Sequence, residues 1–191
     1  MKNCLLMVLA VMMFSVTDAR AAGNGKDLQD KFSSQFSMFY DLSKDHRGMM
    51  PFKMVDAQDK PTTLDQFKGR FVVLHFWATW CPPCVKELPK LKAFKTAKEG
   101  KDLTVVMVSL DYGASYEKIA EFMKKQNIDG LPSYRVPTTD SAWDQLTAFG
   151  LPGTFLIDKK GRVLYKVIGD TDWTAPESTD FIDYLIANQT K

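Results

Sequence analysis

The stretch HFWATWCPPCVKELP, residues 75–89, places two cysteines two residues apart with only prolines between them. It begins within the run GRFVVLHFW, residues 69–77, whose apolar, β-branched and aromatic side chains are typical of a buried central strand. Residues 83–99 follow with apolar side chains at the spacing of one helix face. The cysteine pair is therefore predicted at the junction where a strand ends and a helix begins.

Length and composition indicate one soluble domain preceded by a targeting segment. The chain has 191 residues, of which 45% are apolar and 25% charged, as is usual for a globular protein. Its formal net charge of +2 gives no reason to expect a nucleic-acid partner or a polybasic contact with a membrane.

The first 21 residues have the three parts of a secretory signal peptide. Lys2 gives a positive start, residues 5–14 form an uncharged apolar core, and residues 19–21 fit an A-x-A cleavage site. A retained membrane anchor is the alternative, but the apolar core is short against the roughly 20 residues that a span needs. We therefore expect cleavage and a periplasmic protein. Cys4 would leave with the leader, so that Cys81 and Cys84 remain as the two cysteines.

Beyond the leader, strand-like and helix-like segments alternate before a closing hairpin and helix. This order predicts an α/β fold with a mixed central sheet. The expected elements are a helix at 27–43, a hairpin at 51–64, strands at 69–77 and 103–110, helices at 83–99 and from 116, an irregular segment at 129–140, a short helix around Trp143 and Leu146, strands at 153–158 and 161–169, and a last helix opened by residues 174–177.

A cysteine pair of this kind can be a structural disulfide (a staple), part of a metal-binding site or a reactive dithiol. A disulfide across four residues closes too short a loop to add much stability. A structural zinc site needs about four ligands, yet the other candidates are His46 in a distant loop and His75 inside a strand. We therefore expect neither a staple nor a metal site.

The reactive dithiol has a physical basis. A thiol attacks as its thiolate, and the N-terminus of a helix stabilises negative charge. We expect Cys81, at the start of the helix, to be the exposed nucleophile, and Cys84, further into the helix, to be the hidden resolving thiol. Cys81 would form a mixed disulfide with a substrate, and Cys84 would then release the reduced product.

In this interpretation the two prolines tune the pair. Proline suits the first turn of a helix because the N–H that it lacks would have no partner there. With Cys81 as the N-cap, Pro82 and Pro83 fill that turn, and Pro83 removes one N–H that would stabilise the thiolate. The nearest backbone donor is then the Cys84 N–H. We expect an only moderately lowered pKa for Cys81 and a reducing pair.

Three motifs together, FWATWCPPC (76–84), PGTFLID (152–158) and DKKGRV (158–163), resemble the TlpA/ResA branch of thioredoxin-like proteins. The resemblance covers roughly residues 50–189. It implies a thioredoxin-like fold, with the mixed sheet flanked by helices, and an extracytoplasmic thiol–disulfide oxidoreductase that needs no cofactor of its own. We expect a helical extension at 22–47, with an extra helix, and a thioredoxin-like domain at 48–191 that begins with the hairpin.

The resemblance also assigns residues around the cysteines. Pro152 matches the family's cis-proline, which helps to dock the substrate backbone, with Leu151 and Trp80 as apolar neighbours in the substrate site. Glu87 matches a buried acid of related reductants and shares a helix face with Cys84. A pKa raised by partial burial would let Glu87 pass a proton to or from that thiol. The alternative is an ordinary solvated glutamate.

Two further residues of the predicted strand are expected in the core. His75 stands where the family commonly has asparagine, and we expect a buried, hydrogen-bonded histidine rather than a group that responds to pH. Trp77 is expected to pack in the core, whereas Trp80 would form part of an exposed apolar platform.

The sequence thus favours a monomeric, periplasmic reductant of protein disulfides, supplied with electrons by a membrane reductant of the DsbD type. Its tasks would include cytochrome c maturation or reduction of the copper-site cysteines of cytochrome oxidase. A copper-binding or copper-delivery module using the same thiols and a disulfide isomerase are the alternatives. A peroxidase is disfavoured because no T-x-x-C pattern surrounds Cys81.

Overall fold

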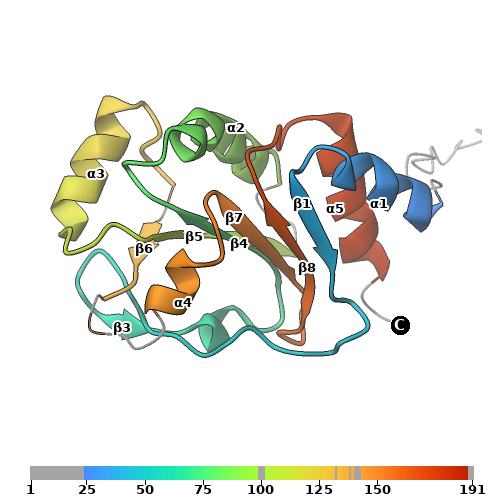
Figure 1. Ribbon diagram of the computed structural model, residues 1–191, viewed down its shortest axis with the longest axis horizontal. Coiled ribbons are helices and arrows are strands. Elements are labelled where there is room, and N and C mark those ends of the chain that lie inside the picture. The colour runs from blue at the N-terminus through green and yellow to red at the C-terminus, as the bar shows by residue number, and fades with distance from the viewer. Residues whose placement is uncertain (1–23, 99–101, 132, 138, 140–142, 189–191) are drawn as a thin grey trace, which may run out of the picture.

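Figure 1 shows the computed structural model, which describes residues 24–98, 102–131, 133–137, 139 and 143–188. Across these residues eight strands form one mixed sheet in the order β1-β8-β7-β4-β5-β6-β2-β3. The expected leader, including Cys4, lies outside the described residues. None of the helices in the described part of the chain combines the length and hydropathy that a membrane span requires.

The centre of the sheet is β4 (Phe71–Trp77), which is buried along its whole length. It pairs in parallel with β5 (Leu103–Ser109) on one side and antiparallel with β7 (Gly153–Ile157) on the other. The expected central strand and the mixed α/β sheet are therefore confirmed. The remaining strands are β1 (Met38–Asp41), β2 (Met54–Val55), β3 (Pro61–Thr62), β6 (Ser133–Arg135) and β8 (Val163–Ile168).

Helices cover both faces of this sheet. The helices are α1 (Gly25–Ser33), α2 (Pro82–Lys98), α3 (Tyr116–Lys125), α4 (Trp143–Thr147), α5 (Pro176–Asn188) and the 3-10 helix η2 (Leu64–Phe67). Buried side chains of α1, α2, α3 and α5 share one apolar cluster with one face of β4, and this cluster includes Cys81 and Cys84. Leu146 of α4 and the residues around the β2–β3 hairpin pack against the other face. Figure 1 shows α1 and α5 together at the β1–β8 end of the sheet and α3 at the opposite end.

The expected single helix at 27–43 is wrong beyond Ser33. The hydroxyls of Ser33 and Ser34 donate to the carbonyls of Asp30 and Lys31, and the helix ends there. After a short turn the chain becomes strand β1, which pairs antiparallel with β8 at the edge of the sheet. Phe36, Phe39 and Tyr40 recur at helical spacing, so the local pattern favours a helix. Pairing with β8 overrides this pattern.

The segment expected to be irregular at 129–140 contains a short strand. Ser133–Arg135 forms β6, which pairs in parallel with the end of β5 and contacts β2 through Val55. Three residues are too few to show an alternating pattern, so this strand depends on its neighbours in the sheet. The other expected elements are present, including the hairpin β2–β3 and the hairpin β7–β8.

Candidate functional site

The two cysteines lie at the start of α2 and are joined by a disulfide. The Cys81 carbonyl accepts the Val85 N–H, so Cys81 is the N-cap and Pro82 and Pro83 occupy the first two helical positions. The Cys84 N–H points at the Cys81 sulfur at 3.3 Å, as predicted from the two prolines. Cys81 retains 4% exposure and Cys84 none. The order of accessibility is as expected, but Cys81 is far less exposed in the disulfide form than predicted.

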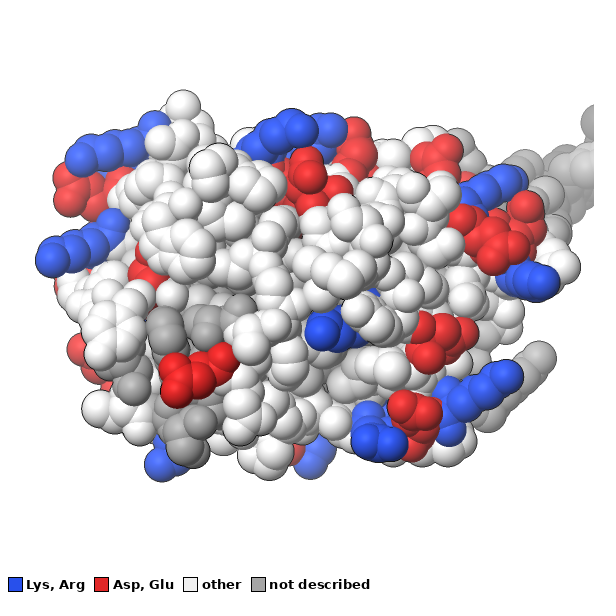
Figure 2. Space-filling view, in the orientation of Figure 1, with Lys and Arg blue, Asp and Glu red and all other residues white. Residues whose placement is uncertain are grey.

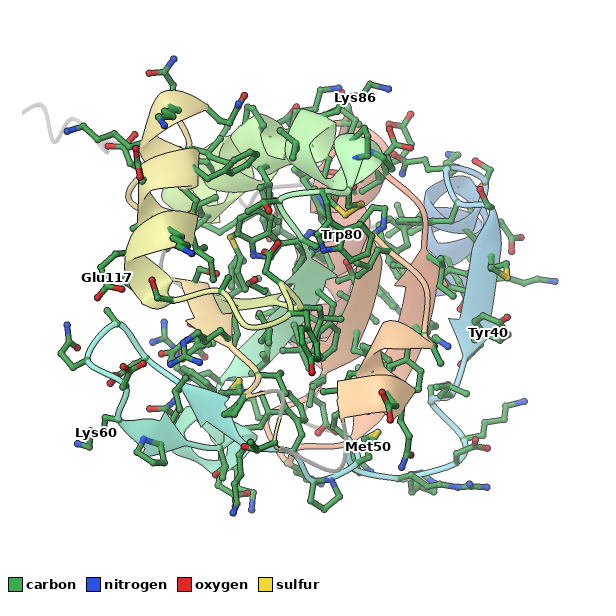
Figure 3. The ribbon with its side chains drawn as sticks, turned by 60° about the vertical axis from the view of Figure 1, so that its left-hand side comes forward. Tyr40, Met50, Lys60, Trp80, Lys86 and Glu117 are labelled. Carbon is green, nitrogen blue, oxygen red and sulfur yellow. A yellow bond between two sulfur atoms is a disulfide. The ribbon has the colours of Figure 1, made fainter. Side chains whose placement is uncertain are left out.

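An exposed aromatic ring and a cis-proline flank the disulfide. Trp80 is 64% exposed and lies beside the sulfur atoms at the N-terminal end of α2 (Figure 3). The Leu151–Pro152 bond is cis, and Leu151 packs against the cluster that contains both cysteines. Because Gly153 pairs with Phe76 near the end of β4, Pro152 lies at the same edge of the sheet as the disulfide. The residues expected at the substrate site therefore share one side of the molecule.

The turn before Pro152 depends on two glycines. Gly150 has a φ of +88°, which favours glycine. A Cβ on Gly153 would lie 2.7 Å from the Gly150 carbonyl oxygen, so any larger residue there would push the backbone apart. These glycines let the chain fold tightly around Leu151 and Pro152 before it enters β7.

Asp111 holds the loop that leads into Cys81. Its carboxylate accepts hydrogen bonds from the Thr79 N–H and hydroxyl, at 3.1 and 2.6 Å, and from the Ser109 hydroxyl at 2.6 Å. Sequence reasoning missed this residue. The signal was available, because an acid directly after a parallel strand lies at the edge where the neighbouring strand β4 also ends.

Glu87 is buried behind the cysteines, with an exposed fraction of 2%. The Trp173 indole N–H donates to Oε1 at 2.9 Å, and the Thr171 main-chain N–H donates to Oε2 at 3.2 Å. Burial raises the pKa of Glu87 to about 8; the two hydrogen bonds oppose this rise and the nearby charge of Asp170 adds to it. The alternative of a solvated glutamate is therefore wrong. Thr171 and Trp173 were not predicted, since they follow β8, far from Glu87 in the sequence.

His75 is the buried neighbour of Glu87 on β4. Its Nδ1 lies 2.9 Å from the Thr154 hydroxyl and 3.6 Å from Glu87 Oε1. Nε2 has no hydrogen-bond partner among the described residues. Burial lowers the pKa of His75 to about 3, while that of Glu87 is raised. Both groups are therefore neutral at pH 7, and the contact is a polar one rather than an ion pair. The predicted hydrogen-bonded core histidine is confirmed, as is the buried position of Trp77.

A polar pocket of about 160 Å³ at the surface has Glu87 in its lining. Gln35 and Thr171 contribute to its lining. Two ion pairs join α2 to the loop after β8 beside it: Lys86 with Asp170 at 3.1 Å, and Lys90 with Asp172 at 2.5 Å. Figure 2 shows basic and acidic side chains side by side over α2. Glu87 is thus buried, yet it lies next to a route by which water can approach.

Two other features bear on ligand binding. Within the described part of the chain, no group of three or more His, Cys, Asp or Glu side chains is placed to hold a metal ion. A larger pocket of about 350 Å³ lies among residues 48–52, 63–68 and 157–161, near the opposite end of β4. None of the residues around the disulfide lines it, so it does not belong to the redox site.

Sequence comparison identifies curated relatives, among them the following two. The thiol-disulfide oxidoreductase ResA of Bacillus thuringiensis subsp. konkukian is 31% identical over 123 residues, which are 62% of this chain and 66% of the relative. The thiol:disulfide interchange protein DsbE of Haemophilus influenzae is 36% identical over 124 residues, or 61% of this chain and 63% of the relative. The chain therefore spans slightly less than two thirds of the length of these relatives.

The fold and the family are established by two further matches. A crystal structure from Chlorobium tepidum, described as a thiol:disulfide interchange protein DsbE, covers 74% of this chain and 96% of its own with a TM-score of 0.61. At 22% identity this likeness concerns the fold, and it confirms the expected thioredoxin-like architecture. The Redoxin family matches residues 25–183, which include both cysteines, Glu87 and the cis-proline. The chain is a member of the Redoxin family.

Proposed function

We propose that the chain is an extracytoplasmic thiol–disulfide oxidoreductase that reduces protein disulfides through Cys81 and Cys84. The observation that carries this proposal is the cysteine pair at a helix N-terminus, backed by a buried acid whose pKa is raised to about 8. The likeness to ResA and DsbE, both named for thiol–disulfide chemistry, supports the same reaction.

The reaction exchanges two electrons and two protons between dithiols and disulfides. The Cys81 thiolate attacks one sulfur of the substrate disulfide, a mixed disulfide forms, and the other substrate sulfur leaves as a thiolate that takes up a proton. Cys84 then loses its proton and attacks Cys81, which releases the second substrate thiol. The enzyme is left as the disulfide seen in the structure. A dithiol donor, a membrane reductant of the DsbD type in our proposal, reverses these steps to regenerate the enzyme.

Glu87 is proposed to exchange a proton with Cys84. Both side chains are buried and one helical turn apart on α2. A pKa of about 8 lies near that of an ordinary thiol, so the protonated carboxyl, the main form at pH 7, can give its proton to Cys84 during regeneration. Its ionised form can accept the Cys84 proton during substrate reduction. Trp80, Leu151 and Pro152 would dock the substrate chain beside Cys81.

Replacement of Pro83 tests the tuning of the nucleophile. Pro83→Ala restores an N–H at the second helical position, and we expect it to lower the pKa of Cys81 by roughly one unit. Pro82→Ala is the matched control, because the first N–H of a helix does not face the N-cap side chain. The measurement is the alkylation rate of the reduced protein against pH. An unchanged or raised pKa in Pro83→Ala would contradict the tuning role.

Replacement of Glu87 tests the proton transfer. We expect Glu87→Gln to slow exchange with a model disulfide at pH 7 by roughly tenfold or more. Reduction of the enzyme's own disulfide should slow above pH 8 in the wild type, since Glu87 loses the proton that it would give to Cys84. This decline should be absent from Glu87→Gln. Stopped-flow kinetics measure both effects. Glu121→Gln, at an exposed glutamate, is the control, and equal rates in both variants would favour a purely structural Glu87.

Trapping identifies the substrate and tests the proposed function as a whole. In Cys84→Ser the resolving thiol is missing, so substrates should stay linked to Cys81 and be identified by mass spectrometry after non-reducing purification. Apocytochrome c, an oxidase subunit or a broad set of secreted proteins would distinguish three pathways. Cys81→Ser/Cys84→Ser is the control. If no proteins are linked and the wild type retains copper stoichiometrically, the results would contradict the reductase function and favour a copper carrier.

A further inference from the structure

Gln35 connects the N-terminal segment, residues 24–41, to the loop that supports Glu87. It lies in the turn between α1 and β1, and its Oε1 accepts the Thr171 hydroxyl at 3.0 Å. Its amide nitrogen donates to the Ser178 hydroxyl on α5 at 3.3 Å. The main-chain N–H of the same threonine donates to Glu87 Oε2. Gln35 therefore fixes the residue that supplies one of the two hydrogen bonds to the buried acid.

The donor of the second hydrogen bond to Glu87 also packs against the N-terminal segment. Phe32 of α1 is fully buried and packs against the rings of Trp173 and Phe181, with centroid distances of 6.5 and 4.8 Å. Trp173 is the indole donor to Glu87 Oε1. A segment distant in sequence from the cysteines thus packs against both donors that hold the acid.

Gln35 also contributes to the lining of the polar pocket that leads to Glu87. The titratable groups around the carboxyl come from three directions: neutral His75 from β4, Lys86 and Lys90 from α2, and Asp170 and Asp172 from the loop after β8. The lysines are paired with the two aspartates. Gln35 is the uncharged residue that the N-terminal segment adds to this pocket.

We propose that Gln35 is a positioning residue for Glu87, and that the N-terminal segment controls the protonation of the redox site through its contact with Thr171. This inference rests on the proposed role of Glu87 in thiol exchange. Without the Gln35 acceptor, Thr171 is free to turn away, and the carboxylate loses part of its main-chain hydrogen bond. An apolar residue in the pocket wall would also reduce the access of water. Both effects favour the protonated carboxyl.

The test is Gln35→Leu, which removes the hydrogen bonds at nearly constant volume. Because the Trp173 indole N–H donates to Glu87, its NMR resonance should report ionisation of the carboxyl in the disulfide form. When the chemical shift of this resonance is plotted against pH, the inflection that is absent from Glu87→Gln is assigned to the Glu87 carboxyl. We expect Gln35→Leu to move it upward by about 0.5–1 pH unit.

Two further variants keep the test decisive. Gln29→Leu is the matched control, because Gln29 lies on the same segment and bonds to Asp41 and Tyr165 rather than to the pocket. It should lower stability without moving the inflection. Thr171→Val removes the hydrogen bond between Thr171 and Gln35 by deleting its donor, and should raise the inflection by the same amount. The double variant Gln35→Leu/Thr171→Val should show no further rise. This variant also serves if Gln35→Leu does not fold.

The result that would overturn the proposal is an unmoved or lowered inflection in folded Gln35→Leu or Thr171→Val, or an equal shift in Gln29→Leu. The titration involves no thiol chemistry, so its outcome is separate from that of the proposed function. If Gln35→Leu shifts the inflection while Glu87→Gln leaves thiol exchange unchanged, the positioning role stands and the proton transfer to Cys84 falls.

Discussion

The burial of one carboxyl, that of Glu87, is the constraint that organises the redox site. An ionised carboxylate with 2% exposure is costly unless it is fully paired, so the group is held largely neutral by its surroundings. Two N–H donors hold the oxygens in place without supplying a full positive charge. In our proposal the acid therefore exchanges a proton near neutral pH with Cys84, the proposed resolving cysteine, one helical turn away. A solvent-exposed glutamate, whose pKa would lie near its ordinary value, would not serve the role that we propose for Glu87.

The rest of the fold places this acid and the disulfide on rigid elements. The parallel pairing of β4 and β5 brings the ends of both strands to one edge of the sheet, where Asp111 fixes Thr79 and the turn into Cys81. The antiparallel pairing of β4 and β7 brings the cis Leu151–Pro152 bond to the same edge. These contacts leave Trp80 as a prominent exposed ring beside a nearly buried disulfide. In our proposal a substrate binds across this apolar rim before its sulfur reaches Cys81.

The sequence predicts well those features whose signals are local. The buried strand, the helix that follows it and the redox pair are read from residues 69–99, and the burial of Glu87 follows from the family motif. Contacts between distant segments are different. Thr171 and Trp173 contact Glu87, and Gln35 contacts Thr171, only because the loop after β8 and the N-terminal segment fold against α2 and α5. No spacing in the sequence indicates these contacts. The failed helix at 34–43 has the same cause, because pairing with β8 outweighs a local spacing that favours a helix.

The central claim is that the proton of Glu87 is linked to the redox state of Cys84. The most direct test is titration of the Glu87 carboxyl carbon by NMR in the disulfide and dithiol forms, with Glu87→Gln used for assignment. The account predicts an inflection near pH 8 in the disulfide form and a higher one in the dithiol form, because a thiolate of the reduced pair would repel the carboxylate. An inflection near the ordinary value of 4.5, or the same value in both forms, would contradict it.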